Sequence, residues 1–178
     1  MKIREIDWER DGECIRSFNA SFTTCAIYRV EIAEMSVELV AEHLKIPFQK
    51  KYMLDDVSES DHGYAAEIGG EIAGFIALRI EEWNRRAILT HLYVAPGFQR
   101  RGIGKALMDA AANYAKTQAA RCLWLETQNV NYPAIQFYKK LGFSFCGFDK
   151  SLYDGAEADE TALFFCRSIR VFEEHHFE

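Results

Sequence analysis

The sequence predicts an α/β fold in which helices cover a mixed β-sheet. Three observations support this prediction: a hairpin pattern begins near residue 64, a strongly periodic helix follows a glycine-containing turn, and a strand, a second helix and two more strands come after it. With 178 residues, of which 49% are hydrophobic, the chain fits one domain with a real core better than two. We therefore expect a single domain over residues 1–178.

The first clear elements are strands. Two apolar runs, residues 64–68 and 72–80, flank the pair Gly69–Gly70, which is typical of a tight turn between antiparallel strands. Residues 86–94 form a further strand candidate that ends before Pro96. The first sixty residues are harder to interpret, because residues 27–44 mix helix-like and strand-like spacing. Residues 52–63 are rich in Asp, Glu and Ser, which favours an exposed acidic loop.

The helices have clear periodicity and end signals. Residues 102–118 carry apolar side chains at i, i+3, i+4, i+7 and i+8 spacing, which predicts a helix with one buried face. A strand over residues 122–126 follows. A second helix is expected from Asn131 or Tyr132 as the cap, with Pro133 in its first turn and Gly142 after its end. Residues 143–148 and 160–169 complete the chain as predicted strands.

Composition restricts the function. The net charge of −6 argues against a nucleic-acid partner, which requires a concentrated basic surface. Five cysteines without a C-x-x-C pair indicate reduced thiols and a cytoplasmic protein. No apolar run reaches the roughly 20 residues that span a bilayer, so we expect no membrane partner. The two histidines near the end, in residues 173–178, have no second cluster at ligand spacing, so we expect a disordered terminus and no metal.

The most informative segment is residues 91–107, where a strand runs through a turn with Gly102 and Gly104 into the first helix. Unpaired N–H groups at a helix start form an anion site, and two arginines and a lysine beside the turn add positive charge. A Walker A loop is excluded because Ile103 follows Gly102, and a dinucleotide fingerprint is excluded because position 107 is Leu. Taken alone, the two glycines are equally compatible with a plain turn.

Further residues extend this pattern into a family resemblance. Gln99-x-x-Gly102-x-Gly104 after an apolar strand resembles the acetyl-CoA motif of the GNAT superfamily of N-acetyltransferases. Two later stretches are similar to that superfamily's later motifs in order and spacing, and the resemblance covers about residues 64–169. These stretches are Leu125-Glu-Thr-Gln-Asn129 and Asn131-x-x-Ala134-x-x-Phe137-Tyr138-x-x-x-Gly142-Phe143. The resemblance implies a mostly antiparallel twisted sheet of six to seven strands, flanked by helices, whose splayed central strands hold acetyl-CoA.

A narrower resemblance concerns the streptothricin (nourseothricin) acetyltransferases, which acetylate an amine of the β-lysine moiety of that antibiotic. It is carried by residues 83–85 (Trp-Asn-Arg), 125–128 (Leu-Glu-Thr-Gln), 147–149 (Gly-Phe-Asp), 152–153 (Leu-Tyr) and 160–162 (Glu-Thr-Ala). The implied reaction is direct acetyl transfer from acetyl-CoA to a primary amine of a small cationic molecule, with antibiotic resistance as a possible role. The alternatives are another acceptor (an aminoglycoside, a polyamine or a protein N-terminus) or an acyl-CoA-binding module without activity. The resemblance leaves open whether the protein is a monomer or a homodimer.

The resemblance also implies site residues. Tyr138 is the expected acid for the leaving thiolate, although it also fits the apolar face of its helix. Many relatives have a Glu directly before the position of His91, and here that residue is Thr90, so either His91 or Glu126 is the expected base. Tyr153 is a candidate for attracting a cationic substrate. The expected contacts to acetyl-CoA are Leu92, Tyr93, Val94, Gln99, Arg100, Arg101, Gly102, Ile103, Gly104, Lys105, Asn131, Ala134 and Tyr138.

Overall fold

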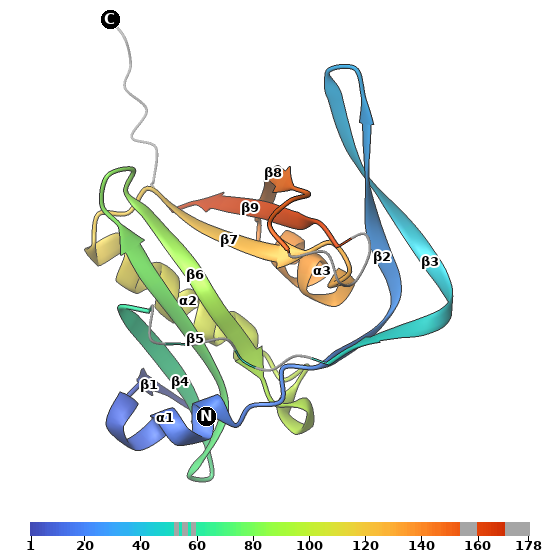
Figure 1. Cartoon of the computed structure of the whole chain (residues 1–178). Coiled ribbons are helices and arrows are strands. Elements are labelled where there is room, and N and C mark those ends of the chain that lie inside the picture. Colours follow the sequence, from blue (N-terminus) through green and yellow to red (C-terminus); the bar gives the residue numbers. More distant parts are fainter. Residues whose placement is uncertain (52–53, 55–56, 58–59, 154–159, 170–178) are drawn as a thin grey trace, which may run out of the picture.

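The computed structural model describes residues 1–51, 54, 57, 60–153 and 160–169. Within these residues one sheet has seven strands in the order β1-β4-β5-β6-β7-β9-β8 (Figure 1). All neighbouring strands in this sheet are antiparallel except β6 and β7, which are parallel. The predicted mixed, mostly antiparallel sheet is therefore confirmed. The strands are β1 (Lys2–Glu5), β4 (His62–Ile68), β5 (Glu71–Glu81), β6 (Arg86–Val94), β7 (Cys122–Gln128), β8 (Ser144–Asp149) and β9 (Ala162–Ser168).

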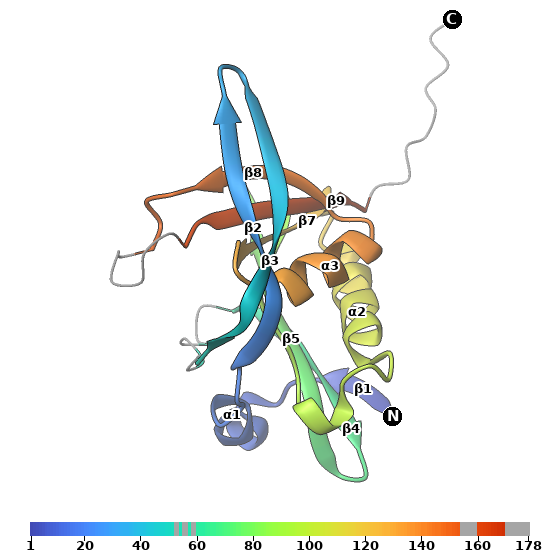
Figure 2. The ribbon, with the colours of Figure 1, turned by 90° about the vertical axis from the view of Figure 1, so that its right-hand side faces the viewer.

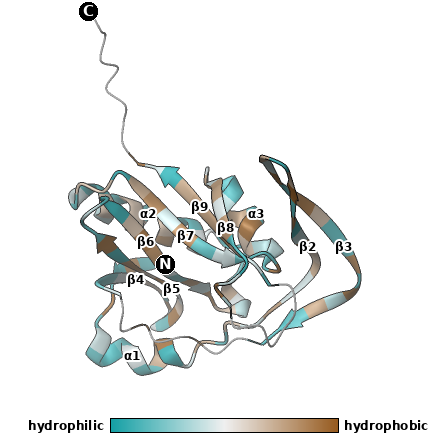
Figure 3. Cartoon of the chain, turned by 45° about the horizontal axis from the view of Figure 1, so that its top comes forward, coloured by the Kyte–Doolittle hydropathy of each residue, from teal (hydrophilic) through white to brown (hydrophobic). Residues whose placement is uncertain are grey.

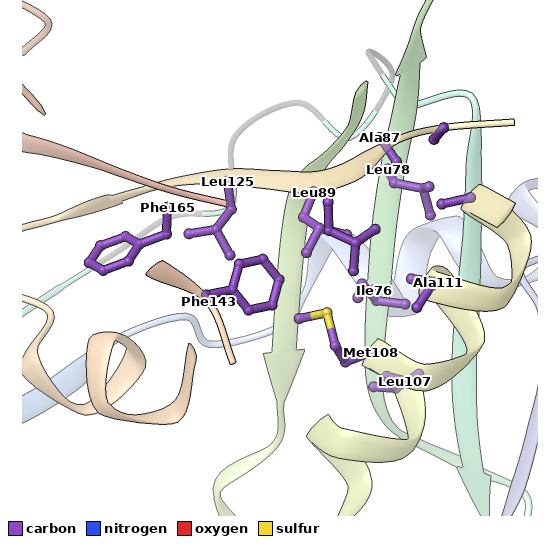
Figure 4. Packing of buried hydrophobic residues seen from close by; sticks show 14 of the residues in the cluster. Ile76, Leu78, Ala87, Leu89, Leu107, Met108, Ala111, Leu125, Phe143 and Phe165 are labelled. Atoms are coloured by element: carbon purple, nitrogen blue, oxygen red, sulfur yellow. The ribbon is translucent and has the colours of Figure 1, made fainter. Parts of the chain in front are cut away.

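Helices lie on both faces of the sheet (Figure 2). Helices α2 (Ile103–Thr117) and α3 (Tyr132–Lys140) lie on one face, and α1 (Trp8–Arg16) lies on the other. The buried stripe of α2 packs on the sheet, where Leu107 and Met108 belong to one cluster with Ile76 and Leu89 (Figure 4). Burying each side chain of this size contributes about 1.5–3 kcal/mol, so the predicted periodicity of α2 anchors the helix to the strands that form the site.

The ends of α2 and α3 follow local signals in the sequence. Gly102 is the N-cap of α2 and has a positive φ of 80°. The Asn131 side chain caps α3 by accepting a hydrogen bond from the Ala134 N–H at 3.3 Å, and Pro133 lies in the first turn. Gly142 follows the end of α3 with a φ of 82°, in the left-handed region that glycine enters without strain. Both predicted helices are thus confirmed to within about one residue at each end.

Strands β2 (Phe22–Ala33) and β3 (Ser36–Lys50) form a long hairpin that projects from the body of the molecule (Figure 1). This hairpin contains residues 27–44, whose spacing was ambiguous in the sequence. Midway along β2, Tyr28 is buried, stacks on Tyr132 and accepts a hydrogen bond from Gln136. Near its tip, Ile32 and Met35 are exposed, and the hydropathy colours show apolar residues there (Figure 3). The spacing is mixed because only part of the ribbon has a buried face.

Two contacts tie the hairpin to the sheet. The Asn129 Nδ2 donates to the Tyr28 carbonyl oxygen at 2.7 Å, and the Asn129 Oδ1 accepts from the Thr161 N–H at 2.8 Å. Lys50 at the end of β3 forms a largely buried ion pair with Glu160. The end of β7, the middle of β2 and the approach to β9 therefore meet at one place beside the site.

Two predicted segments extend beyond the described residues. Of the predicted acidic loop over residues 52–63, positions 54, 57 and 60–63 are described, and His62 and Gly63 already belong to β4. The predicted disordered terminus over residues 173–178 lies outside the described residues. No helix in the described part of the chain is long and apolar enough to cross a membrane.

Candidate active site

The parallel strands β6 and β7 separate halfway along their length. They pair only over residues 86–89 and 122–125, although both continue further (Figure 1). Beyond that point β6 stays paired with β5, and the Ala95 N–H donates to the Ala73 carbonyl oxygen at 2.9 Å. Because successive residues of a strand direct their backbone groups to opposite sides, the groups of Leu92 and Val94 face away from β5. The splay expected from the resemblance is present, and it leaves polar backbone groups that require partners.

A β-bulge lies at the start of the splayed part of β6. Ala77 pairs with His91 while Leu78 pairs with Leu89, so Thr90 is the extra residue. The Thr90 Oγ1 lies 2.7 Å from the Ser60 Oγ. A bulge bends a strand and redirects its side chains, and this one turns the end of β6 away from β7. Thr90, the departure from the family pattern, is therefore the bulge residue itself.

A pocket of about 160 Å³ opens where the strands separate. It brings together the three candidate catalytic residues, His91, Glu126 and Tyr138, from β6, β7 and α3. Five of the predicted acetyl-CoA contacts line it: Tyr138 itself and Leu92, Tyr93, Asn131 and Ala134. The remaining lining residues are Ala20, Phe22, Leu89, Thr90, Thr127, Gln128 and Tyr153.

Tyr138 faces this pocket from α3 and is partly exposed to it. Burial of the phenol, together with the negative charge of Glu126, raises the pKa of Tyr138 well above its usual value near 10. The hydroxyl therefore keeps its proton over the whole physiological pH range. A phenol in this state can donate a hydrogen bond to a group that develops negative charge.

Glu126 lies on β7 opposite Phe164 of β9, and it lines the same pocket. Its carboxylate accepts a hydrogen bond from the hydroxyl of Tyr153, which comes from the segment after β8. This contact fixes the orientation of the carboxylate. A carboxylate so placed can bind a cationic amine and accept its proton.

His91 enters the pocket from the bulged part of β6. Its ring lies near the rings of Phe75 and Tyr93, with centroids 6.3 Å away in both cases. An imidazole can accept a proton at a ring nitrogen, so His91 is a second candidate for the base. The structure thus places both candidate bases around one cavity.

The predicted phosphate-binding turn lies at the start of α2. The N-cap residue Gly102 has no side chain to accept a hydrogen bond from the first N–H groups of α2, and a Cβ added there would meet nothing within 4 Å. Ile103 is 1% exposed and can contribute only its backbone. Gly104 lies close to α3, because a Cβ on it would be 3.1 Å from the Phe137 ring. The turn fits a pyrophosphate, since an open helix start attracts anions.

The polar side chains of this turn have contacts of their own. The Gln99 Nε2 donates to the Val94 carbonyl oxygen at 3.1 Å, at the end of β6. The Arg101 guanidinium lies 5.5 Å from the Phe98 ring centroid, and Lys105 forms an ion pair with Asp109 at 2.6 Å. Arg100 is exposed and has a φ of 61°. Residues 99–105 do not line the pocket described above and form a separate part of the predicted acetyl-CoA contacts.

Sequence reasoning missed several lining residues. Ala20 and Phe22 belong to the first sixty residues, which were hard to interpret, and no motif marks them. Thr127 and Gln128 lie inside the quoted Leu125–Asn129 motif, so the motif was the signal that could have found them. Among the residues that the structure describes, no cluster of His, Cys, Asp or Glu has the geometry of a metal site.

Comparisons with known proteins agree with this geometry. Residues 25–143 match the profile of the Acetyltransferase (GNAT) family. The chain is 36% identical to a streptothricin acetyltransferase of Streptomyces lavendulae, over 86% of this chain and 88% of that protein. The crystal structure of a nourseothricin acetyltransferase is similar, with a TM-score of 0.85, 34% identity, and 95% and 98% of the two chains covered. A putative streptothricin acetyltransferase from Bacillus anthracis in complex with acetyl coenzyme A matches with a TM-score of 0.81, 28% identity, and coverage of 94% and 98%.

Proposed function

The chain belongs to the GNAT family and is an acetyl-CoA-dependent acetyltransferase, and we propose that it acetylates a primary amine of a small cationic molecule, the β-lysine moiety of streptothricin. The observation that carries this proposal is the pocket at the splay, where a carboxylate, an imidazole and a protonated phenol meet beside the unpaired edge of β6. The similarity to streptothricin acetyltransferases over most of the chain supports the choice of acceptor.

In the proposed complex, the backbone groups of Leu92 and the Val94 N–H pair with the pantetheine arm of acetyl-CoA as a neighbouring strand would, while the Val94 carbonyl oxygen keeps its hydrogen bond from Gln99. The start of α2 holds the pyrophosphate through the N–H groups that follow Gly102. The Leu92 N–H faces the gap and is the best placed donor for the oxyanion of the tetrahedral intermediate. Holding acetyl-CoA and amine together supplies much of the acceleration through proximity.

The proton transfers use the other residues of the pocket. An amine with a pKa near 10.4 arrives as an ammonium ion and must lose a proton before it attacks the thioester. Glu126 attracts the ammonium and accepts that proton directly or through water, and His91 is the alternative base. Tyr138 stays protonated and donates a hydrogen bond to the departing sulfur of CoA. Because the raised pKa of Tyr138 opposes full proton transfer, its main contribution is stabilisation of the thiolate.

The first test measures CoA release from acetyl-CoA with streptothricin, kanamycin, spermidine, free β-lysine and a peptide with a free N-terminus. We expect rapid release with streptothricin and slow or no release with the others. Tyr138→Phe should lower kcat by about 10²–10⁴-fold while the KM for acetyl-CoA changes little. Tyr132→Phe, on the same helix but outside the pocket, is the matched control and should retain activity. Saturable acetyl-CoA binding without release from any acceptor would instead favour a binding module.

The base is identified by the pH dependence of kcat/KM in Glu126→Gln and His91→Gln. The variant that lacks the base should lose the acidic limb of the profile and most of its activity, whereas the other should keep the shape of the wild-type profile. Loss of the limb in His91→Gln alone would reassign the base to His91.

A further inference from the structure

Three cysteines from three neighbouring strands share one face of the sheet, away from the active-site pocket. Cys166 of β9 lies opposite Trp124 of β7 and opposite Ser144 of β8. Side chains alternate along a strand, so Cys122, two residues before Trp124, lies on the same face as Cys166. A surface cavity of about 370 Å³ is lined by Cys122, Cys146 and Cys166 together with Arg86, Arg121, Trp124 and Phe164. It shares no lining residue with the active-site pocket.

A β-bulge brings Cys146 towards Cys166. Phe145 pairs with Phe165 and Gly147 pairs with Phe164, so Cys146 is the extra residue between these two pairs. The shift moves Cys146 along β8 towards the pair that Ser144 forms with Cys166. Cys146 is an exposed residue and Cys166 is half-buried, and Cys166 lies close enough to help raise the pKa of Cys146.

Cys122 is a poorer partner for either thiol. It is 6% exposed, and its backbone lies opposite Ser168, so it faces Cys166 only diagonally without a bulge to shorten the distance. β9 separates it from Cys146, and two strand spacings of about 4.8 Å each exceed the Cα separation that a disulfide tolerates. The geometry therefore singles out one pair among the three thiols.

We propose that Cys146 and Cys166 form a dithiol that a low-molecular-weight disulfide, such as oxidised glutathione, converts to an intrachain disulfide. One thiolate of the pair attacks the glutathione disulfide, forms a mixed disulfide and releases one glutathione thiolate. The second cysteine loses its proton to solvent, attacks the protein sulfur of the mixed disulfide and releases the second glutathione. The protein dithiol is oxidised, the glutathione disulfide is reduced to two thiols, and no other reactant is needed.

The charges around the cavity fit this chemistry. Arg86 and Arg121 supply guanidinium groups at the cavity that hosts the thiols, and these suit the carboxylates of glutathione. Burial, followed by the charge and hydrogen bond of Cys166, raises the pKa of Cys146 to about 11, while Arg86 opposes the rise. The exchange should therefore accelerate as the pH increases from 7 to 9, because the thiolate fraction increases.

The test uses the full chain incubated with oxidised glutathione, followed by intact mass and thiol titration after denaturation. We expect free thiols to fall from five to three and the mass to fall by two hydrogens, with peptide mapping that joins Cys146 to Cys166. Cys146→Ser and Cys166→Ser should instead stop at a stable mixed disulfide with glutathione. Cys14→Ser, an exposed cysteine on α1, is the matched control and should form the disulfide as the wild type does.

Three results would overturn the proposal: no loss of hydrogens in the folded wild type, a mapped link that involves Cys122, or a link between two chains. Circular dichroism of each variant separates a loss of reactivity from a loss of folding. None of these measurements depends on acetyl transfer, so they test the disulfide proposal independently of the proposed activity.

Discussion

The side chain of Glu126 interacts with the hydroxyl groups of two tyrosines, Tyr153 and Tyr138. Tyr153 donates a hydrogen bond to its carboxylate, and the charge of that carboxylate helps to raise the pKa of Tyr138. The effects are linked through one side chain, because the charge of Glu126 adds to the larger effect of burial in raising the pKa of Tyr138. One carboxylate can thus attract the amine on one side and maintain the hydrogen-bond donor for the leaving group on the other.

A second carboxylate, Asp11 on α1, contributes to stability instead of catalysis. It is 4% exposed and accepts hydrogen bonds from the Arg4 Nη1 at 2.6 Å and Nη2 at 3.0 Å, and from the Arg10 Nε at 2.9 Å. We expect Asp11→Asn to lower the free energy of unfolding by about 2–3 kcal/mol, because charge-assisted hydrogen bonds are lost in a buried place. Urea denaturation at pH 7 measures this. The exposed pair of Lys105 and Asp109 provides the control, since Asp109→Asn should cost less than about 1 kcal/mol.

The effect of Asp11 should depend on pH in one direction. The hydrogen bonds from Arg4 hold the pKa of Asp11 well below its usual value of about 3.9. A lowered pKa in the folded state means that the stabilisation is fully present above about pH 5 and is lost as the pH falls below about 4. The difference between wild type and Asp11→Asn should therefore be constant from pH 5 to 8 and shrink in acid. A constant difference down to pH 2 would contradict this assignment.

At the scale of the elements, Gly74 of β5 lies close to the backbone of β6, beside the splayed end of that strand. A Cβ at Gly74 would lie 2.6 Å from the Tyr93 carbonyl oxygen and 3.1 Å from the Val94 Cα, so backbone would have to move. We expect Gly74→Ala to cost about 1–3 kcal/mol of stability and to raise the KM for acetyl-CoA, because it displaces the edge that pairs with the pantetheine arm. Thermal unfolding and steady-state kinetics measure the two effects.

Gly97 is the matched control for Gly74, because a Cβ there would meet nothing within 4 Å. Gly97→Ala should leave both stability and KM close to wild type. If Gly74→Ala behaves in the same way, the close contact of the two strands does not determine how β6 is placed.

Across the whole molecule, the sequence predicted the elements whose signals are local. The ends of α2 and α3 follow from Gly102, Asn131 and Gly142, each of which acts within a few residues. The hairpin of β2 and β3 could not be predicted, because burial of Tyr28 depends on Tyr132, Asn129 and Gln136, which are about 100 residues away. The same limit applies to the site: motifs indicated Glu126 and Tyr138, whereas Phe22 reaches the pocket only through the path of the hairpin.

Asn129 is the point at which these distant parts depend on one another. It is 5% exposed, and its side chain bonds the Tyr28 carbonyl oxygen on β2 and the Thr161 N–H before β9. Asn129→Ala should lower the free energy of unfolding by about 2–3 kcal/mol, because two buried backbone groups lose their partners. It should also raise the KM for the amine more than that for acetyl-CoA, since Phe22 and Gln128 line the pocket on either side of this junction.

Hydrogen exchange followed by mass spectrometry locates the effect of Asn129→Ala. Faster exchange should appear together in the middle of β2, the end of β7 and the start of β9, because one side chain joins all three. Ser36→Ala removes a hydrogen bond of 2.9 Å to the Ala33 carbonyl oxygen at the exposed tip of the hairpin, and it should change the stability by less than about 0.5 kcal/mol. Faster exchange confined to β2 would show that the hairpin is held independently of the site. Joint exchange in the three segments would instead mean that the hairpin and the acceptor side of the pocket form one cooperative unit.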